Sequence, residues 1–206
     1  MSKTIPMILS NSCVLVLDKE TREFKPFTLA TVSKPNIPFF HQYAEKIAQT
    51  QLQFKEFMQS IYGKKLSKYI LAIIVPDDTT ALESIFINEF FVNSGACKAV
   101  AQATMAQSLS KNHSRYISIS KSDRNITLQY INNNEIKASR FYNGSDYDVN
   151  TIMEDAKRLH IDIEYAGVPV FVNNFNMNMD DFENVGQVIT PKEFMDKIAD
   201  IDVEMV

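Results

Sequence analysis

The feature that most constrains the fold is an uninterrupted apolar run in the first half of the chain. Residues 68–76 read KYILAIIVP, and the polar residues DDTT follow directly. A strand with one face in solvent alternates apolar and polar residues, whereas a strand covered on both faces is apolar throughout. The run therefore predicts a central strand in a sheet with helices packed on both faces, which is the α/β class of fold.

The patterns on either side of this strand predict two similar sets of elements, each with three strands followed by helices that alternate with strands. In the first set, strands are expected at residues 5–9, 13–17, 24–32, 68–76 and 97–101, and helices at residues 41–62, 80–95 and 104–109. In the second set, strands are expected at residues 116–120, 125–131, 136–141 and 168–172, and helices at residues 148–160 and 190–198. Capping-box patterns (TALE and TPKE) open two of the helices. We therefore predict two halves, residues 1–112 and 113–206, each a mixed sheet flanked by helices.

Composition excludes several classes of function. The net charge of −4 gives no basic footprint for nucleic acid, and the basic residues between 111 and 124 are interrupted by Asp123 and predict a solvated loop. Cys13 and Cys97 are far apart and show no ligand spacing, so neither a disulfide framework nor a zinc site is expected. No signal sequence or membrane-spanning run is apparent. These features predict a cytoplasmic protein that binds neither nucleic acid nor a membrane.

Several short segments match motifs of one superfamily. Residues 11–14 (NSCV) resemble the end of the phosphate loop D-L-G-T-T-N-S-C-V of DnaK-type chaperones. Residues 73–76 (IIVP) resemble the I-T-V-P strand end of chaperones and the I-C-V-P of rod-shape actins, residues 80–95 match the helix that follows, and residues 103–106 (ATMA) resemble the E-P-T-A-A-A segment. The chain thus resembles the actin, heat-shock-chaperone and sugar-kinase ATPases. This resemblance implies two ribonuclease H-like halves of βββαβα type, and no insertion is long enough to form large outer subdomains.

The chain departs from this superfamily where the family contacts ATP. The family is expected to hold phosphates in Gly-rich hairpin turns, each with an Asp for the metal. Here residues 7–10 (MILS) contain neither residue type, and Ser118 stands where the second Asp is expected in residues 118–123 (SISKSD). Residues 173–174 (NN) replace two glycines of the adenosine strand at 171–174, and Gln102 replaces an acid. The resemblance with these four changes implies no bound nucleotide, cofactor or metal and no catalytic residue.

The polar residues at the altered positions are candidates for a vestigial cleft. They are Ser10, Asn11, Ser12, Ser120, Ser122, Asp123, Asn173 and Asn174. They either fill a former nucleotide site that no longer binds a ligand, or form a polar cleft that binds a small ligand.

The main hypothesis is a nucleotide-free pseudo-ATPase that acts as an interaction or assembly module, binding a protein partner or a second copy of itself. Some large apolar residues are candidates for exposed contacts, although most aromatic residues are expected in the core: Phe39, Phe40, Phe90, Phe91, Phe175, Met177 and Met179. An alternative is a diverged ATPase or kinase with a remodelled phosphate site, which needs two carboxylates such as Asp18 and Asp123 to hold Mg²⁺. A different α/β domain is the third possibility.

Overall fold

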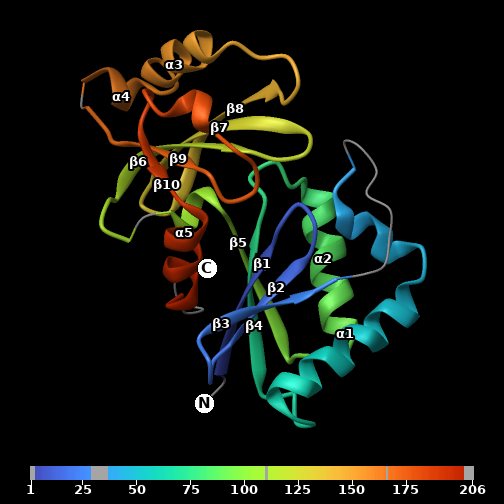
Figure 1. Ribbon diagram of the computed structural model, residues 1–206. Helices are drawn as coiled ribbons and strands as arrows, with labels where there is room; N and C mark the ends of the chain where they lie inside the picture. Colours follow the sequence, from blue (N-terminus) through green and yellow to red (C-terminus); the bar gives the residue numbers. More distant parts are fainter. Residues whose placement is uncertain (1–2, 29–36, 110, 166, 202–206) are drawn as a thin grey trace. The chain divides into compact units, whose positions relative to one another are not determined.

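A computed structural model describes residues 3–28, 37–109, 111–165 and 167–201 (Figure 1). The chain forms two compact units. The first comprises Met1–Ala103 with Ile198–Val206, and the second comprises Thr104–Lys197. Each unit is described by itself below. The division into the halves 1–112 and 113–206 stays a prediction.

The first unit contains a five-stranded mixed sheet with the strand order β3-β2-β1-β4-β5. Its strands are β1 (Lys3–Leu9), β2 (Val14–Asp18), β3 (Glu23–Phe27), β4 (Tyr69–Val75) and β5 (Ala99–Thr104). The first three strands are antiparallel neighbours, whereas β4 runs parallel to β1. Strand β4 is the predicted central strand, and five of its seven residues from Leu71 onward are consecutively buried. The expected strand segment 29–32 lies outside the described residues.

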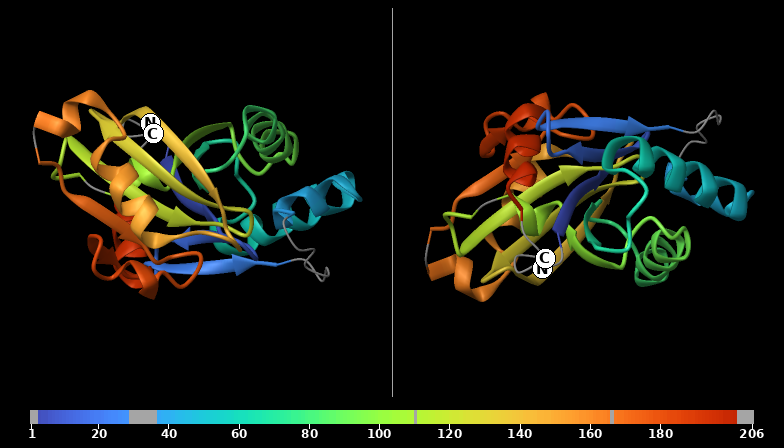
Figure 2. Two further views of the ribbon diagram at one scale, coloured as in Figure 1. Left: turned by 90° about the horizontal axis from the view of Figure 1, so that it is seen from above. Right: turned by 90° about the horizontal axis from the view of Figure 1, so that it is seen from below.

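Two long helices cover one face of this sheet. They are α1 (Ile47–Tyr62) and α2 (Ala81–Asn93), and Figures 1 and 2 show both on the same side of the strands. Phe54 from α1 and Phe91 from α2 pack together with a ring-centroid distance of 4.8 Å. They belong to one core with alternate residues of β1 and β4, among them Met7 and Ile73.

The helix expected at residues 41–62 is two separate elements. A 3-10 helix, η1 (Phe39–Ala44), precedes α1, and Lys46 between them has a non-helical backbone with φ −138°. The expected end at Gly63 is confirmed, since this residue has φ +75°, a conformation that favours glycine. Apolar spacing continues across the break, which is why periodicity did not reveal it.

The capping box predicted for α2 is confirmed. The Thr80 side chain accepts a hydrogen bond from the Glu83 N–H, and the Glu83 carboxylate accepts one from the Thr80 N–H. Phe90 is buried, whereas Leu82 and Ile85 are 76% and 61% exposed. Because α2 carries apolar residues on all sides, apolar spacing could not identify its buried face.

The second unit contains another five-stranded mixed sheet, with the order β10-β9-β6-β7-β8. Its strands are β6 (Arg115–Lys121), β7 (Asn125–Asn132), β8 (Glu135–Asn143), β9 (Val170–Asn173) and β10 (Gln187–Ile189). Strands β6, β7 and β8 are antiparallel, and β9 runs parallel to both β6 and β10. The three-residue strand β10 is too short to produce an apolar pattern and was missed in the sequence.

Short helices complete the second unit. They are η2 (Ala106–Ser108), α3 (Val149–Lys157), α4 (Ile161–Tyr165), η3 (Asp180–Phe182) and α5 (Pro191–Ala199), the last of which ends at the boundary with the first unit. Ile152 and Ala156 of α3 pack on Ile126 and Leu128 of β7. The Thr190–Glu193 capping box that opens α5 is formed as predicted.

Each unit therefore carries a mixed sheet of three antiparallel strands extended by parallel strands, with helices packed on it, which confirms the predicted α/β class. No large outer subdomain interrupts either sheet in the described residues. Across those residues, no helix is both long enough and apolar enough to cross a membrane.

Candidate functional site

The turn between β1 and β2 is closed by a serine side chain. The Ser10 hydroxyl accepts hydrogen bonds from the backbone N–H groups of Ser12 and Cys13, at 3.3 and 3.1 Å. It also donates to the Cys13 carbonyl at 2.9 Å, and the Ser10 N–H donates to the same carbonyl at 3.0 Å. Two of the N–H groups within this turn are therefore bound by the chain's own hydroxyl.

The turn between β6 and β7 has the same construction. The Ser122 hydroxyl accepts from the N–H groups of Arg124 and Asn125, at 3.0 and 3.1 Å. The Ser122 N–H donates to the Asn125 carbonyl at 2.9 Å. Asp123, the second residue of the turn, is half-buried. A serine at the first position again binds the N–H groups two and three residues later.

The two turns occupy equivalent places in their sheets. Each follows a seven-residue strand that also pairs in parallel with another strand, β1 with β4 and β6 with β9. The last strand pairs before the turns are Leu9 with Val14 and Lys121 with Ile126. Residues 7–9, which the resemblance assigned to the first phosphate turn, instead lie buried within β1.

One face of the second sheet carries a row of buried polar residues. Ser118 lies opposite Gln129 in the register, and Ser120 lies opposite both Thr127 and Asn173. All five residues are less than a tenth exposed. The Gln129 amide donates to Ser139 at 3.3 Å, but the Ser118 hydroxyl oxygen and the Asn173 amide nitrogen have no hydrogen-bond partner among the residues that the structure describes. This face, found only once the register was known, offers uncharged donors and acceptors.

The two asparagines that replace the expected glycines organise the loop after β9. The Asn173 side-chain oxygen accepts from the Phe175 N–H at 3.1 Å. The Asn174 side-chain oxygen accepts from the Met179 N–H at 2.8 Å, and its own N–H donates to the Ile189 carbonyl at 3.0 Å. Their side chains thus bind backbone groups within the same loop.

The two carboxylates considered for Mg²⁺, Asp18 and Asp123, lie in different units and at different positions relative to the hairpin turns. Asp18 ends β2, roughly 13 Å from the Ser10 turn at about 3.3 Å per strand residue, and it accepts from the Glu20 N–H at 3.0 Å. Asp123 lies beside Ser122 in the second unit. Within the described ranges, no three His, Cys, Asp or Glu residues group closely enough to hold a metal ion.

The cysteine thiols have different surroundings. Burial raises the pKa of the Cys97 thiol to about 11, so this group is protonated at neutral pH. The Cys13 sulfur lies 3.4 Å from the Ser10 hydroxyl. Neither environment is that of an activated nucleophile, since no histidine or other base is recorded in contact with either thiol in the part of the chain that the structure describes.

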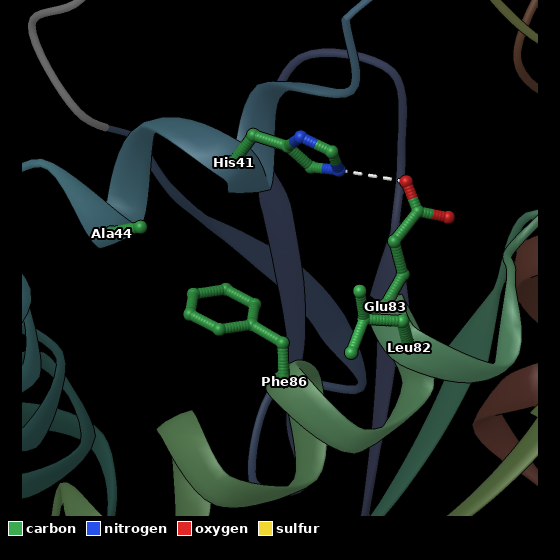
Figure 3. Close-up of a pocket in the computed structure, with 5 residues that line it drawn as sticks. All are labelled: His41, Ala44, Leu82, Glu83 and Phe86. Carbon is green, nitrogen blue, oxygen red and sulfur yellow. Dashed lines mark hydrogen bonds and ion pairs between the residues drawn. The ribbon is translucent and has the colours of Figure 1, made fainter.

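A shallow pocket of about 360 Å³ lies between η1 and α2, and the sequence did not reveal it. Ala44, Leu82 and Phe86 form its apolar wall, and His41 and Glu83 form its polar edge (Figure 3). His41 Nε2 lies 2.7 Å from the Glu83 carboxylate, which also binds the helix start. Glu83 is thus a buried structural acid that connects two helices.

For most of the residues named as candidates for exposed contacts, the prediction is wrong. Phe40, Phe90, Phe91 and Met179 are buried, whereas Phe39, Phe175 and Met177 are half-buried. The exposed large apolar residues of the described chain lie elsewhere: Ile37, Ile47, Leu52, Leu82, Ile85, Val92, Ile136, Phe141 and Ile161. A single sequence does not distinguish an aromatic residue in the core from one on the surface, because both appear as isolated apolar letters.

The described architecture is that of the actin-like ATPase fold. The AlfA filament bound to AMPPNP has a TM-score of 0.53 and 13% identity, over 97% of this chain and 95% of that one. The ethanolamine utilization protein EutJ of Carboxydothermus hydrogenoformans has a TM-score of 0.50 and 14% identity, over 95% and 87%. MreB5 of Spiroplasma citri bound to ADP has a TM-score of 0.47 and 13% identity over 75% of this chain, which spans 55% of MreB5. No protein-family model and no curated protein matches the sequence.

Proposed function

We propose that this chain is a nucleotide-free member of the actin-like fold that serves as an interaction or assembly module. The observation that supports this proposal most strongly is the closure of both hairpin turns by Ser10 and Ser122. Phosphate binding by such a turn requires backbone N–H groups that point at the anion. Here two N–H groups of each turn already donate to a serine hydroxyl.

The charge of the surrounding residues supports the same proposal. Mg²⁺ in phosphate sites is held by carboxylates together with phosphate oxygens. The buried polar face of the second sheet contains hydroxyl and amide groups and no carboxylate among Ser118, Ser120, Thr127, Gln129 and Asn173. Such a face gives a metal–triphosphate complex little electrostatic stabilisation.

Assembly is the role that the similar structures suggest. AlfA was determined as a filament, and we carry over to this chain only the capacity of the fold to self-associate. We therefore propose that this chain binds a second copy of itself or another protein in the cytoplasm, and neither nucleic acid nor a membrane.

A diverged ATPase or kinase remains the second candidate. Two observations favour it: the AlfA filament is bound to AMPPNP, and the buried Ser118 and Asn173 side chains each have a polar atom without a partner, as a small-ligand site would offer. If the chain binds a nucleotide through these groups, it does so without the turn geometry of the superfamily.

Release of inorganic phosphate from Mg-ATP and Mg-GTP by the purified chain separates the two candidates. We expect no release above a protein-free blank, because the five described residues of the buried polar face include no carboxylate to position Mg²⁺ and water. If phosphate release is detected, the variants Ser118→Ala and Asn173→Ala show whether it depends on these two buried side chains. Release that these variants abolish would contradict the proposal, whereas release that they leave unchanged would indicate a contaminating enzyme.

A further inference from the structure

Strand β8 is the least protected sheet edge in the described chain. It is an outer strand of the second sheet, it has nine residues, and seven of these are exposed. The outer strand β3 is shorter and contains Lys25 and Pro26, and the outer strand β10 has three residues. The remaining outer strand, β5, has six residues, and none of them is exposed. Lysine, proline and short length are features that protect an edge from pairing with another chain. Strand β8 has neither proline nor a short length.

The hydrogen-bond pattern identifies the backbone groups that point away from β7. The Gly144 N–H donates to the Arg124 carbonyl at 3.1 Å, in the same register that pairs Asn143 with Asn125. Because bonded and non-bonded pairs alternate along an antiparallel ladder, Tyr142 and Arg140 face β7. Ser139, Phe141 and Asn143 therefore direct their N–H and C=O groups outward. A bulge at Tyr130 and Ile131 limits this regular stretch to residues 138–143.

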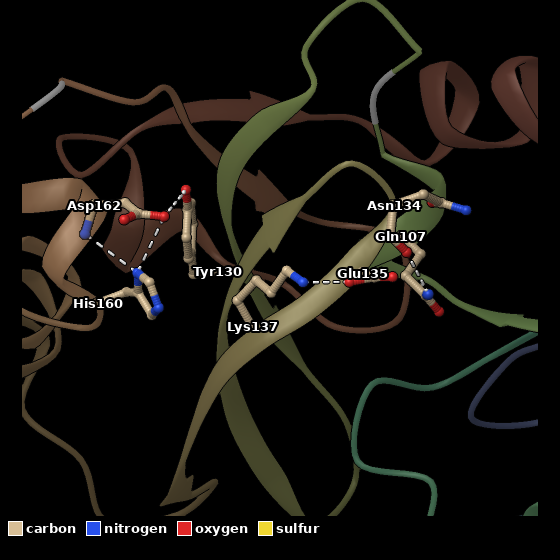
Figure 4. A network of polar contacts seen from close by, with 7 residues as sticks. All are labelled: Gln107, Tyr130, Asn134, Glu135, Lys137, His160 and Asp162. Carbon is tan, nitrogen blue, oxygen red and sulfur yellow. Dashed lines mark hydrogen bonds and ion pairs between the residues drawn. The ribbon is translucent and has the colours of Figure 1, made fainter.

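The charges that would protect this edge are neutralised within the unit. Lys137 forms an ion pair with Glu135 on the same strand (Figure 4). Arg140 forms an ion pair with Asp155 of α3, and Tyr142 donates to the same carboxylate at 2.8 Å. The outward residues Ser139, Phe141 and Asn143 are uncharged, so charge repulsion does not oppose pairing with an identical strand.

We propose that β8 pairs in antiparallel orientation with β8 of a second copy of this chain, with the two-fold axis at Phe141. In this register Phe141 lies opposite Phe141 of the partner subunit, and Ser139 lies opposite Asn143 of the partner subunit. Outward-pointing residues meet outward-pointing residues, as a continuous ladder requires. The proposal rests on the proposed assembly function and specifies the surface that it uses.

The side chains also favour this register. Phe141 is 55% exposed in the single chain, and an aromatic pair directly across two strands adds to the stability of a sheet. Arg140 lies opposite Tyr142 of the partner subunit, so no two like charges are directly opposed. Strand pairing alone gives a small contact, below the lower limit of about 1,200 Å² for a standard stable interface. We therefore expect a weak dimer that forms as the concentration rises.

Sedimentation velocity over a range of protein concentrations tests the pairing. The wild-type chain is expected to shift from 23.5 kDa towards twice that mass as the concentration rises. Ser139→Pro removes an outward N–H but no bond to β7, and it should keep the chain monomeric. Ser139→Ala loses the same hydrogen bond from Gln129 and retains the N–H, so it should dimerise like the wild type.

Oxidative cross-linking is the second test, and it needs no proline variant. In a bonded antiparallel pair the Cα atoms lie about 5.5 Å apart, which a disulfide spans. Phe141→Cys should therefore form a covalent dimer, whereas Ser139→Cys, which faces Asn143 of the partner subunit, should not. If the wild-type chain stays monomeric at every concentration, the proposal is wrong. It is also wrong if the Ser139→Pro variant dimerises like the wild type and the Phe141→Cys variant forms no covalent dimer. Neither outcome concerns nucleotide binding, which tests the proposed function separately.

Discussion

Replacing Glu83 with alanine is expected to lower the free energy of unfolding by about 2–3 kcal/mol. The Glu83 carboxylate is buried and makes two short contacts, 2.8 Å from the Thr80 nitrogen and 2.7 Å from His41 Nε2. Its removal deprives the start of α2 of one half of the capping box and separates η1 from α2. Urea unfolding followed by circular dichroism measures the change.

The capping box of α5 supplies the matched control. Glu193 accepts from the Thr190 N–H at 2.8 Å, but it is exposed, and its side-chain hydrogen bonds in the described residues are with Thr190. Glu193→Ala should therefore cost only about 0.5–1 kcal/mol. Glu83→Gln retains one acceptor oxygen and should fall between the wild type and Glu83→Ala. Equal losses for the two alanine variants would show that the contact of Glu83 with His41 contributes nothing to stability.

The double variant Ser10→Ala/Ser122→Ala is expected to lose about 2 kcal/mol, roughly 1 kcal/mol for each turn. Each hydroxyl accepts from two N–H groups at 3.0–3.3 Å, and its removal leaves these groups to water. The hydrogen bonds named above lie within each turn, and the two turns belong to different units, so the single losses should add. Thermal unfolding of both single variants and the double variant measures the effect.

Two further variants make this test specific. Ser12→Ala changes an exposed neighbour in the same turn and should cost less than about 0.5 kcal/mol. Ser122→Asn retains a side-chain oxygen that can accept from N–H groups two or three residues later, so it should recover most of the loss. If Ser122→Ala unfolds like the wild type, the hydroxyl does not hold the turn closed.

Features that depend on neighbouring residues were predictable from the sequence. The capping boxes at Thr80 and Thr190, the end of α1 at Gly63 and the buried strand β4 each rest on a few consecutive residues. The doubled order of strands and helices followed from these elements together with the motif resemblance. The closed turns also had a local signal, a serine at the first position of each hairpin turn, although its significance was apparent only from the N–H groups that it binds.

Features that depend on the packed structure were not predictable. The exposed Leu82 and Ile85 of α2 are apolar, as is the buried Phe90, so only packing distinguishes the exposed side of the helix from the buried one. The row of polar residues on β6, β7 and β9 requires the register between strands. The unprotected edge at β8 requires the strand order, which places β8 outside β7. The vestigial candidates Ser120 and Asn173 proved to be opposite each other, whereas their relation to Ser10, Asn11 and Ser12 stays a prediction.

Thermal unfolding of the wild-type chain with and without millimolar Mg-ATP, Mg-ADP and Mg-GTP tests the central claim most directly. A ligand at about 100 times its Kd adds about 2.7 kcal/mol to the stability of the folded state and raises Tm by several degrees. The closed turns predict no Mg-dependent change in Tm with any of the three nucleotides. A clear rise in Tm that requires Mg²⁺ and is lost in Ser118→Ala or Asn173→Ala would contradict the account and establish a nucleotide site.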